Sequence, residues 1–224
     1  MGFFKKLLSA GISDEVLALK EAAENGDAKA QYELSQCYGL GQGVKQDFDK
    51  AFKWLENSAK NGYGTAQVDL GMVYQTGIWS YTAKPSNEKA YEWTKKAADQ
   101  GVPKGYLNLG ILYLNGIHVQ KDYRIARDYM EKAASLGETD GFYNLGVIYY
   151  EGLGVDVNFE KSAEYYLEGA ELGNAGCQNN LGWLYQNGYG VPQNVEKAVT
   201  WYRKAAEQGF SYAIDNLRNL GFNS

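Results

Sequence analysis

The stretch NAGCQNNLGWLYQNGYGVPQNVEKAVTWYRKAAEQG, residues 174–209, decides the fold of this chain. Its first half carries apolar side chains at helical spacing up to Asn187, and the glycines and proline of residues 188–193 interrupt that pattern. Asn194 is a suitable N-cap for a second helix, which carries an apolar stripe and stops at Gly209. The stretch therefore predicts two helices, helix A and helix B, joined by a glycine-rich turn.

The same signature recurs along the whole chain. The signature leucines are 36, 39, 36, 36 and 36 residues apart, at Leu34, Leu70, Leu109, Leu145, Leu181 and Leu217. A signature tyrosine follows four residues after each of the first five, at Tyr38, Tyr74, Tyr113, Tyr149 and Tyr185. Helix B should end at a closing glycine in every unit, at Gly26, Gly62, Gly101, Gly137, Gly173 and Gly209. A fixed period of this length predicts stacked repeats rather than one globular core.

We therefore expect an all-α chain of about twelve helices. A half-repeat helix B at residues 14–24 precedes five A/B pairs, and a final helix A covers residues 211–220. The expected organisation is one solenoid over residues 1–224, with an N-terminal extension (1–13), a capping helix (14–26), repeats at 27–62, 63–101, 102–137, 138–173 and 174–209, and a C-terminal cap (210–224).

Glycines inside helix A predict close contacts between helices. Gly71, Gly110, Gly146 and Gly182 each follow a signature leucine, although a glycine within a helix costs about 1 kcal/mol relative to alanine. Helix B also carries small pairs such as Ala205-Ala206, and at a fixed offset from them a row of large aromatics, Trp54, Trp93, Tyr129, Tyr165 and Trp201. We expect an aromatic to enter the gap that a small residue leaves.

Composition narrows the classes of partner. The net charge of −5 argues against nucleic acid as a partner and permits basic or neutral partners. Cys37 and Cys177 lie about four repeats apart, so we expect two reduced thiols and a cytoplasmic protein. Residues 1–11 carry too short an apolar run for a secretory signal, which leaves a capping turn or a membrane-surface helix as alternatives.

The repeats resemble the Sel-one-like repeat (SLR) family, a relative of the tetratricopeptide repeat. The matching positions in the last unit are Leu181-Gly182, Tyr185, Gly188, Gly190-Val191, Lys197-Ala198, Trp201-Tyr202 and Lys204-Ala205-Ala206-Glu207 with Gly209. The resemblance covers about residues 14–220 and implies a right-handed α/α superhelix that serves, often in bacteria, as a protein-interaction scaffold. A non-catalytic protein without cofactor or metal, with monomer as the favoured state, is the expectation.

Three motifs suggest chemistry, and each has a structural alternative. His118 lies in an A–B turn as a solvated loop residue or, alternatively, a ligand or catalytic group, but no metal-ligand cluster accompanies it. The loop Gly39-Leu-Gly-Gln-Gly43 looks like a phosphate-binding loop, yet it lacks the preceding strand that such loops need. Ser86-Asn-Glu-Lys89 matches the S-x-x-K motif of serine penicillin-binding enzymes, whereas Ser86 also stands where helix B needs its N-cap.

Helix A should line the concave face of the predicted superhelix, by analogy with tetratricopeptide arrays. The position before the signature leucine holds a row of asparagines that includes Asn108, Asn144 and Asn180, which either hold a peptide backbone or bond a neighbouring helix. Beside them we expect an apolar floor of Leu107, Ile111, Leu114, Tyr143, Val147, Tyr150 and Trp183, unless these side chains pack between repeats.

The 39-residue step supplies a second candidate surface. Three extra residues fall in the A–B turn at residues 77–85, which contains Trp79 and Tyr81. Such irregular loops often carry function, although Trp79 could instead fold back over the neighbouring turn.

Three functions fit these patterns. The first is an interaction scaffold that binds a protein or peptide on the concave face. The second is an immunity-type protein that neutralises a secreted bacterial effector. The third, and most remote, is a penicillinase-like hydrolase that uses Ser86.

Overall fold

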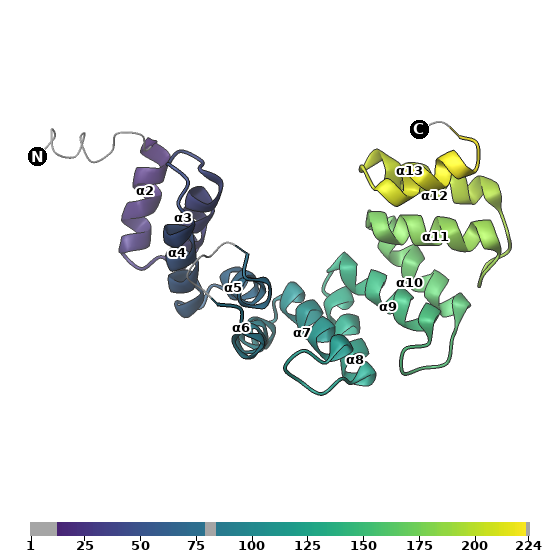
Figure 1. Ribbon diagram of the computed structural model, residues 1–224, viewed down its shortest axis with the longest axis horizontal. Helices are drawn as coiled ribbons and strands as arrows, with labels where there is room; N and C mark the ends of the chain where they lie inside the picture. The colour runs from purple at the N-terminus through teal and green to yellow at the C-terminus, as the bar shows by residue number, and fades with distance from the viewer. Residues whose placement is uncertain (1–12, 79–83, 223–224) are drawn as a thin grey trace, which may run out of the picture. The chain divides into compact units, whose positions relative to one another are not determined.

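The computed structural model describes residues 13–78 and 84–222, and these residues form twelve helices and no strand (Figure 1). The helix B elements are α2 (Asp14–Glu24), α4 (Phe48–Lys60), α6 (Asn87–Asp99), α8 (Tyr123–Ser135), α10 (Phe159–Glu171) and α12 (Val195–Glu207). The helix A elements are α3 (Ala28–Leu40), α5 (Gly64–Thr76), α7 (Pro103–Asn115), α9 (Thr139–Glu151), α11 (Ala175–Asn187) and α13 (Ser211–Asn219). The predicted all-α fold of two-helix repeats is confirmed. The N-terminal segment 1–12, Trp79 and Tyr81 lie outside the described residues.

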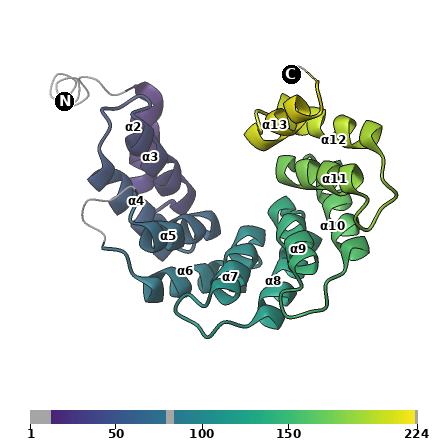
Figure 2. The same cartoon turned by 45° about the vertical axis from the view of Figure 1, so that its right-hand side comes forward.

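The chain divides into two compact units, one ending at Asn108 and the other starting at Leu109. In the first unit, α2 packs on α3, α3 on α4, α4 on α5 and α5 on α6 (Figure 2). In the second unit the same order of packing joins α8 through α13, and α11 also contacts α9. The predicted single solenoid over residues 1–224, with its stated repeat bounds, stays a prediction.

Polar caps and glycines set the helix ends. The caps of α4, α6, α8, α10 and α12 each accept a hydrogen bond from the backbone N–H three residues on, and they are Asp47, Ser86, Asp122, Asn158 and Asn194. The closing glycines that follow helix B all have φ between 81° and 92°. A side chain is disfavoured in this left-handed region, which explains why glycine recurs at this position.

A backbone hydrogen bond closes the A–B turns. In each case the N–H of the helix B cap residue donates to the carbonyl of the signature tyrosine, over 2.7–3.1 Å, in the pairs Asp47–Tyr38, Ser86–Tyr74, Asp122–Tyr113, Asn158–Tyr149 and Asn194–Tyr185. The bond forms in the repeat with three extra residues as well. It thereby fixes where helix B begins relative to helix A.

The helix A glycines do mark close approaches between helices, as predicted. A Cβ placed on Gly182 would lie 2.9 Å from two ring carbons of Tyr202, and one on Gly146 would lie 2.5 Å from Cδ1 of Tyr166. The rings that fill the gaps left by these two glycines belong to Tyr166 and Tyr202, which each stand one position after the predicted aromatic row. Tyr165, in the predicted row, stacks instead on a signature tyrosine, Tyr149, at 5.6 Å.

Lysines of helix B cover the signature tyrosines. In four repeats the ammonium group lies 4.3–5.4 Å from the ring centroid, in the pairs Lys50–Tyr38, Lys89–Tyr74, Lys161–Tyr149 and Lys197–Tyr185. This is the geometry of a cation–π contact. It explains why a lysine stands at the same helix B position in these units.

Three buried glutamines tie successive helices together. Gln31, Gln67 and Gln178 each donate a side-chain hydrogen bond to the carbonyl of an alanine at the end of the preceding helix B, over 2.9–3.1 Å. Each also accepts one from an amide side chain at the end of the following helix B, in the pairs Asn61–Gln31, Gln100–Gln67 and Gln208–Gln178. Both ends of a buried amide are therefore satisfied.

Candidate functional site

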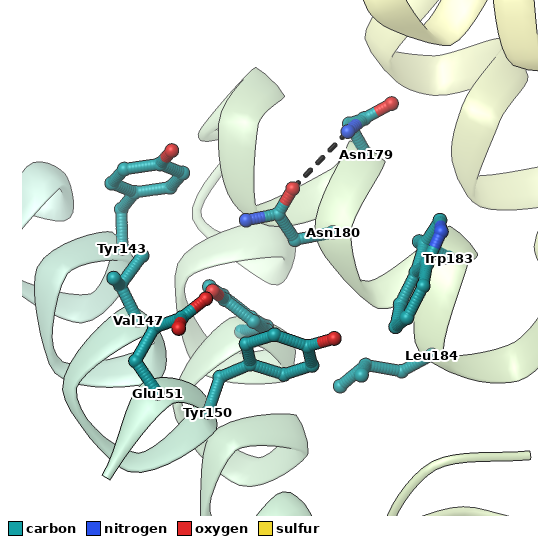
Figure 3. Close-up of a pocket in the computed structure, with 9 residues that line it drawn as sticks. Tyr143, Val147, Tyr150, Glu151, Asn179, Asn180, Trp183 and Leu184 are labelled. Carbon is teal, nitrogen blue, oxygen red and sulfur yellow. Dashed lines mark hydrogen bonds between the residues drawn. The ribbon is translucent and has the colours of Figure 1, made fainter.

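A pocket of about 420 Å³ opens among α9, α10 and α11 in the second unit (Figure 3). Its lining is mainly aromatic and amide in character, and it consists of Tyr143, Val147, Tyr150, Glu151, Tyr166, Asn179, Asn180, Trp183 and Leu184. None of these nine residues is basic.

One face of α9 supplies the first wall. Tyr143, Val147, Tyr150 and Glu151 are spaced by four, three and one residues, so a helix of 3.6 residues per turn brings them to one side. Tyr143, Val147 and Tyr150 are each half-buried, and Glu151 is exposed at the last position of the helix. In Figure 3 the Glu151 carboxylate points toward the middle of the group.

The facing wall comes from α11, where asparagines form a hydrogen-bonded row. The Asn179 amide donates to the side-chain oxygen of Asn180 over 3.1 Å, and Asn216 of α13 donates to Asn179 over 3.0 Å. This row orients Asn180 toward the α9 side of the pocket (Figure 3). Asn179 thus supports Asn180 and joins α11 to α13.

Four aromatic rings pack together beside the pocket. Trp183 stacks on Tyr189 with centroids 5.2 Å apart and 10° between planes, and Tyr150 meets Trp183 edge to face at 5.7 Å. Phe159 completes the cluster against Tyr150 and Tyr189. These contacts restrict the orientations of Tyr150 and Trp183 on this side of the pocket.

The pocket holds one formal charge. Burial raises the pKa of Tyr150, followed by the nearby Glu151 carboxylate and Tyr189. Burial also raises the pKa of Tyr166. Both phenols are therefore neutral near pH 7, and Glu151 supplies the only charged side chain among the nine lining residues.

The structure brings together five of the predicted site residues: Tyr143, Val147, Tyr150, Asn180 and Trp183. Asn144 and Ile111 belong to the same unit but do not line the pocket, and the Asn144 amide donates to the Asp140 carbonyl of its own helix over 2.7 Å. Asn108 is half-buried and ends the first unit. None of the described residues tests the candidate surface at Trp79 and Tyr81.

The prediction that Leu107 contributes to an exposed apolar floor is wrong, because its side chain is only 3% exposed. Two positions before the signature leucine, Val68 and Asn179 are also buried, whereas Tyr32 and Tyr143 are half-exposed. This position lies at the boundary between the interior and the surface. Only a long side chain reaches out from it.

Four lining residues were absent from the predicted site: Glu151, Tyr166, Asn179 and Leu184. Tyr166 comes from helix B, which was not expected to contribute. The signal that could have found it is Gly146, since the gap left by that glycine is filled by the Tyr166 ring.

The sequence was compared with models of known protein families, and one repeat family matches. The Sel1 repeat model matches five times, at residues 28–63, 64–102, 103–138, 143–174 and 175–210, and therefore covers most of the sequence. The chain belongs to the Sel1 repeat family. No curated protein matches the sequence significantly.

Solved structures with Sel1 repeats match over most of this chain. A Sel1 repeat protein from Oxalobacter formigenes is 32% identical with a TM-score of 0.78, over 92% of this chain and 58% of that one. A protective antigen of uropathogenic Escherichia coli with an SLR fold is 34% identical with a TM-score of 0.77, over 92% and 44%. An immunity protein from Pseudomonas aeruginosa is 26% identical with a TM-score of 0.58, over 83% and 66%. This chain thus spans about half the length of the first two.

Within this Sel1 fold, Ser86 and the loop at residues 39–43 have structural roles, and His118 takes the backbone conformation of a turn glycine. Ser86 caps α6, where its Oγ accepts from the Lys89 backbone N–H at 3.3 Å, while the Lys89 ammonium lies over Tyr74. Gly41 ends α3 in the left-handed conformation within the loop at residues 39–43. His118 has φ 63°, where three sister turns have glycines with φ of 66–68°.

Three further features concern the cysteines, potential metal ligands and membrane spans of the described residues. Cys37 and Cys177 are both free thiols. No group of three or more potential metal ligands occurs among residues 13–78 and 84–222. No helix in the described part of the chain has the length and apolarity needed to cross a membrane. Sel1 repeats are typical of non-catalytic scaffolds that bind other proteins.

Proposed function

We propose that this protein is a non-catalytic scaffold that binds a protein or peptide segment in the pocket formed by α9, α10 and α11. The observation that carries the proposal is the lining of the pocket, in which Tyr143, Tyr150 and Trp183 surround about 420 Å³ of space. Tyrosine and tryptophan are the side chains that most often anchor protein interfaces. The pocket is of the size that suits anchoring side chains of a partner rather than a whole helix.

Amide groups give the pocket a means to orient an extended chain. Asn180 accepts one bond from Asn179 and is also hydrogen-bonded to Tyr166. An asparagine amide has two donors and two acceptor lone pairs, so part of its bonding capacity remains. Asn144, one turn from the pocket residue Val147, uses one donor within its own helix. A peptide backbone that crosses α9 and α11 could bond the remaining amide groups while its side chains enter the pocket.

The proposed test blocks the pocket without disturbing the packing beneath it. Val147→Arg places a long side chain into the pocket from a half-exposed position. The matched control is Val157→Arg, since Val157 is 54% exposed and does not line the pocket. Trp183→Ala is a poorer choice, because Trp183 also stacks on Tyr189 and its loss would disturb the fold.

Peptides selected from a random display library on the full chain should bind the wild type and Val157→Arg equally. They should bind Val147→Arg at least about tenfold more weakly, which corresponds to about 1.4 kcal/mol. Circular dichroism establishes that both variants remain helical. Unchanged peptide binding by a folded Val147→Arg variant would refute the assignment of the pocket.

An immunity role is the second candidate, and it rests on the likeness to the P. aeruginosa immunity protein. In that case a toxic effector should be encoded beside this gene, and its expression alone should stop growth. Co-expression of the wild type or of Val157→Arg should restore growth, whereas Val147→Arg should not. Normal growth of a deletion strain with an intact neighbouring toxin would contradict this candidate.

A cytoplasmic location and a monomeric state form part of the proposal. The free thiols of Cys37 and Cys177 support the first, because cytoplasmic proteins keep their cysteines reduced. Cell fractionation tests the location, and light scattering of the purified protein tests the monomer. Recovery in the periplasmic fraction would contradict the cytoplasmic location. A mass of twice the expected value would contradict the monomeric state.

A further inference from the structure

The negative charge of this protein is unevenly distributed. Residues 1–108 hold equal numbers of basic and acidic side chains, so the entire net charge of −5 belongs to residues 109–224. These residues form the second compact unit, which also contains the α9–α11 pocket. A basic partner is therefore attracted to this unit in particular.

The pocket itself has the composition of a site for a cation. Three tyrosines and one tryptophan line it, and their ring faces carry partial negative charge. Glu151 adds a full negative charge at the rim, and its carboxylate points toward the rings (Figure 3). No lysine or arginine lines the pocket, so nothing among its lining residues already neutralises Glu151.

The contrast with the rest of the fold is informative. The signature tyrosines Tyr38, Tyr74, Tyr149 and Tyr185 each have a lysine ammonium over the ring. Tyr143 and Tyr150 have aromatic neighbours instead, namely Tyr166 and the cluster with Trp183. The lysine that covers the ring in those four repeats has no counterpart among the pocket residues, so a cation from another molecule can take its place.

We infer that the pocket of α9, α10 and α11 receives an arginine or lysine side chain from a basic segment of the partner, held between the aromatic rings and the Glu151 carboxylate. This inference rests on the proposed function and adds the chemical class of the partner. The aliphatic stem of the side chain would lie along the half-buried Val147, and the charged end would face Glu151. The Asn180 amide is placed to bond the adjoining backbone.

The test compares two peptides that differ only in charge. Fluorescein-labelled peptides with five Arg–Gly repeats or five citrulline–Gly repeats are titrated with the full chain, and binding is followed by fluorescence anisotropy. Citrulline keeps the shape and hydrogen-bonding edge of arginine but is neutral. The arginine peptide should bind about tenfold more tightly than the citrulline peptide, because it adds a cation–π contact and an ion pair.

The matched variants separate the pocket from the general negative field. Glu151→Gln should weaken the arginine peptide about threefold to fivefold and leave the citrulline peptide unchanged. Glu164→Gln, an exposed change of the same charge on α10 outside the pocket lining, should weaken the arginine peptide less than about twofold.

Three results would overturn the inference. Equal affinity for the two peptides removes the preference for a cation. Equal effects of Glu151→Gln and Glu164→Gln reduce the binding to a general electrostatic attraction. The inference also fails if neither peptide binds. If both peptides bind equally and Val147→Arg abolishes both, the pocket still binds peptides and only the charge preference is refuted. If Val147→Arg changes neither, the proposed function is refuted as well.

Discussion

Gly146→Ala offers the sharpest test of how the repeats pack. A Cβ at this position would lie 2.5 Å from Cδ1 and 2.8 Å from Cζ of Tyr166, and nearer still to Cε1. The ring must move by about 1 Å to recover a normal carbon–carbon separation. Tyr166 is buried and also lines the pocket, so its ring has little freedom to move.

Two opposing effects decide the sign. Alanine favours the helix over glycine by about 1 kcal/mol. Overpacking in a tight interior costs about 1–3 kcal/mol, and the separation here favours the upper end. We expect a net loss of about 1–2 kcal/mol, which lowers the melting temperature by about 2–8 °C for a chain of this length.

The assay is thermal and urea unfolding followed by far-ultraviolet circular dichroism. Gly182→Ala is the graded control, because its Cβ would stand 2.9 Å from the Tyr202 ring and should cost less. In a Tyr166→Leu background, which removes Cε1 and Cζ, the Gly146→Ala change should lose most of its cost. A Gly146→Ala variant that is more stable than wild type, or an unchanged cost in that background, would refute the packing argument.

Three further predictions concern single side chains. His118→Gly should raise the melting temperature by about 2–4 °C, since a residue other than glycine at φ 63° costs about 1 kcal/mol; an unchanged or lower value would show that the histidine side chain offsets this cost. Gln67→Leu should lower the free energy of unfolding by about 1–3 kcal/mol, measured in urea, because it removes a buried hydrogen bond to Ala59 and a part-buried one from Gln100. A neutral effect would refute the role of this glutamine. Burial raises the pKa of the Cys177 thiol to about 12, so this thiol stays protonated at pH 8. A reagent that reacts with the thiolate form of cysteine should therefore label Cys37 first and Cys177 only after unfolding. Equal labelling rates of the two cysteines in the native protein would contradict this.

The helix boundaries could be predicted from sequence because local chemistry sets them. The helix A predicted to end at Asn187 matches the end of α11, and the predicted first helix at 14–24 matches α2. Caps such as Asn194 and stops such as Gly209 act within a few residues of their own position. Six copies of the same signal also made each boundary easier to recognise.

The arrangement of the site was harder to predict because it depends on which helix faces which. Tyr143 and Leu107 stand at the same repeat position, yet only the tyrosine is long enough to reach the surface. Tyr166 enters the pocket from helix B, and no periodicity within helix A could indicate that. Sequence reasoning also missed the buried glutamines, such as Gln31, whose partners lie in two other helices.

The hydrogen bond between Ser86 and Tyr74 has a consequence for how such proteins can diversify. It forms at 2.7 Å across a turn with three more residues than its counterparts, so the register of the two helices does not depend on the length between them. Closing a somewhat longer loop costs only a few tenths of a kcal/mol. New segments can therefore be inserted between the carbonyl of a signature tyrosine and the next cap, by evolution or by an engineer, with little effect on the helices on either side.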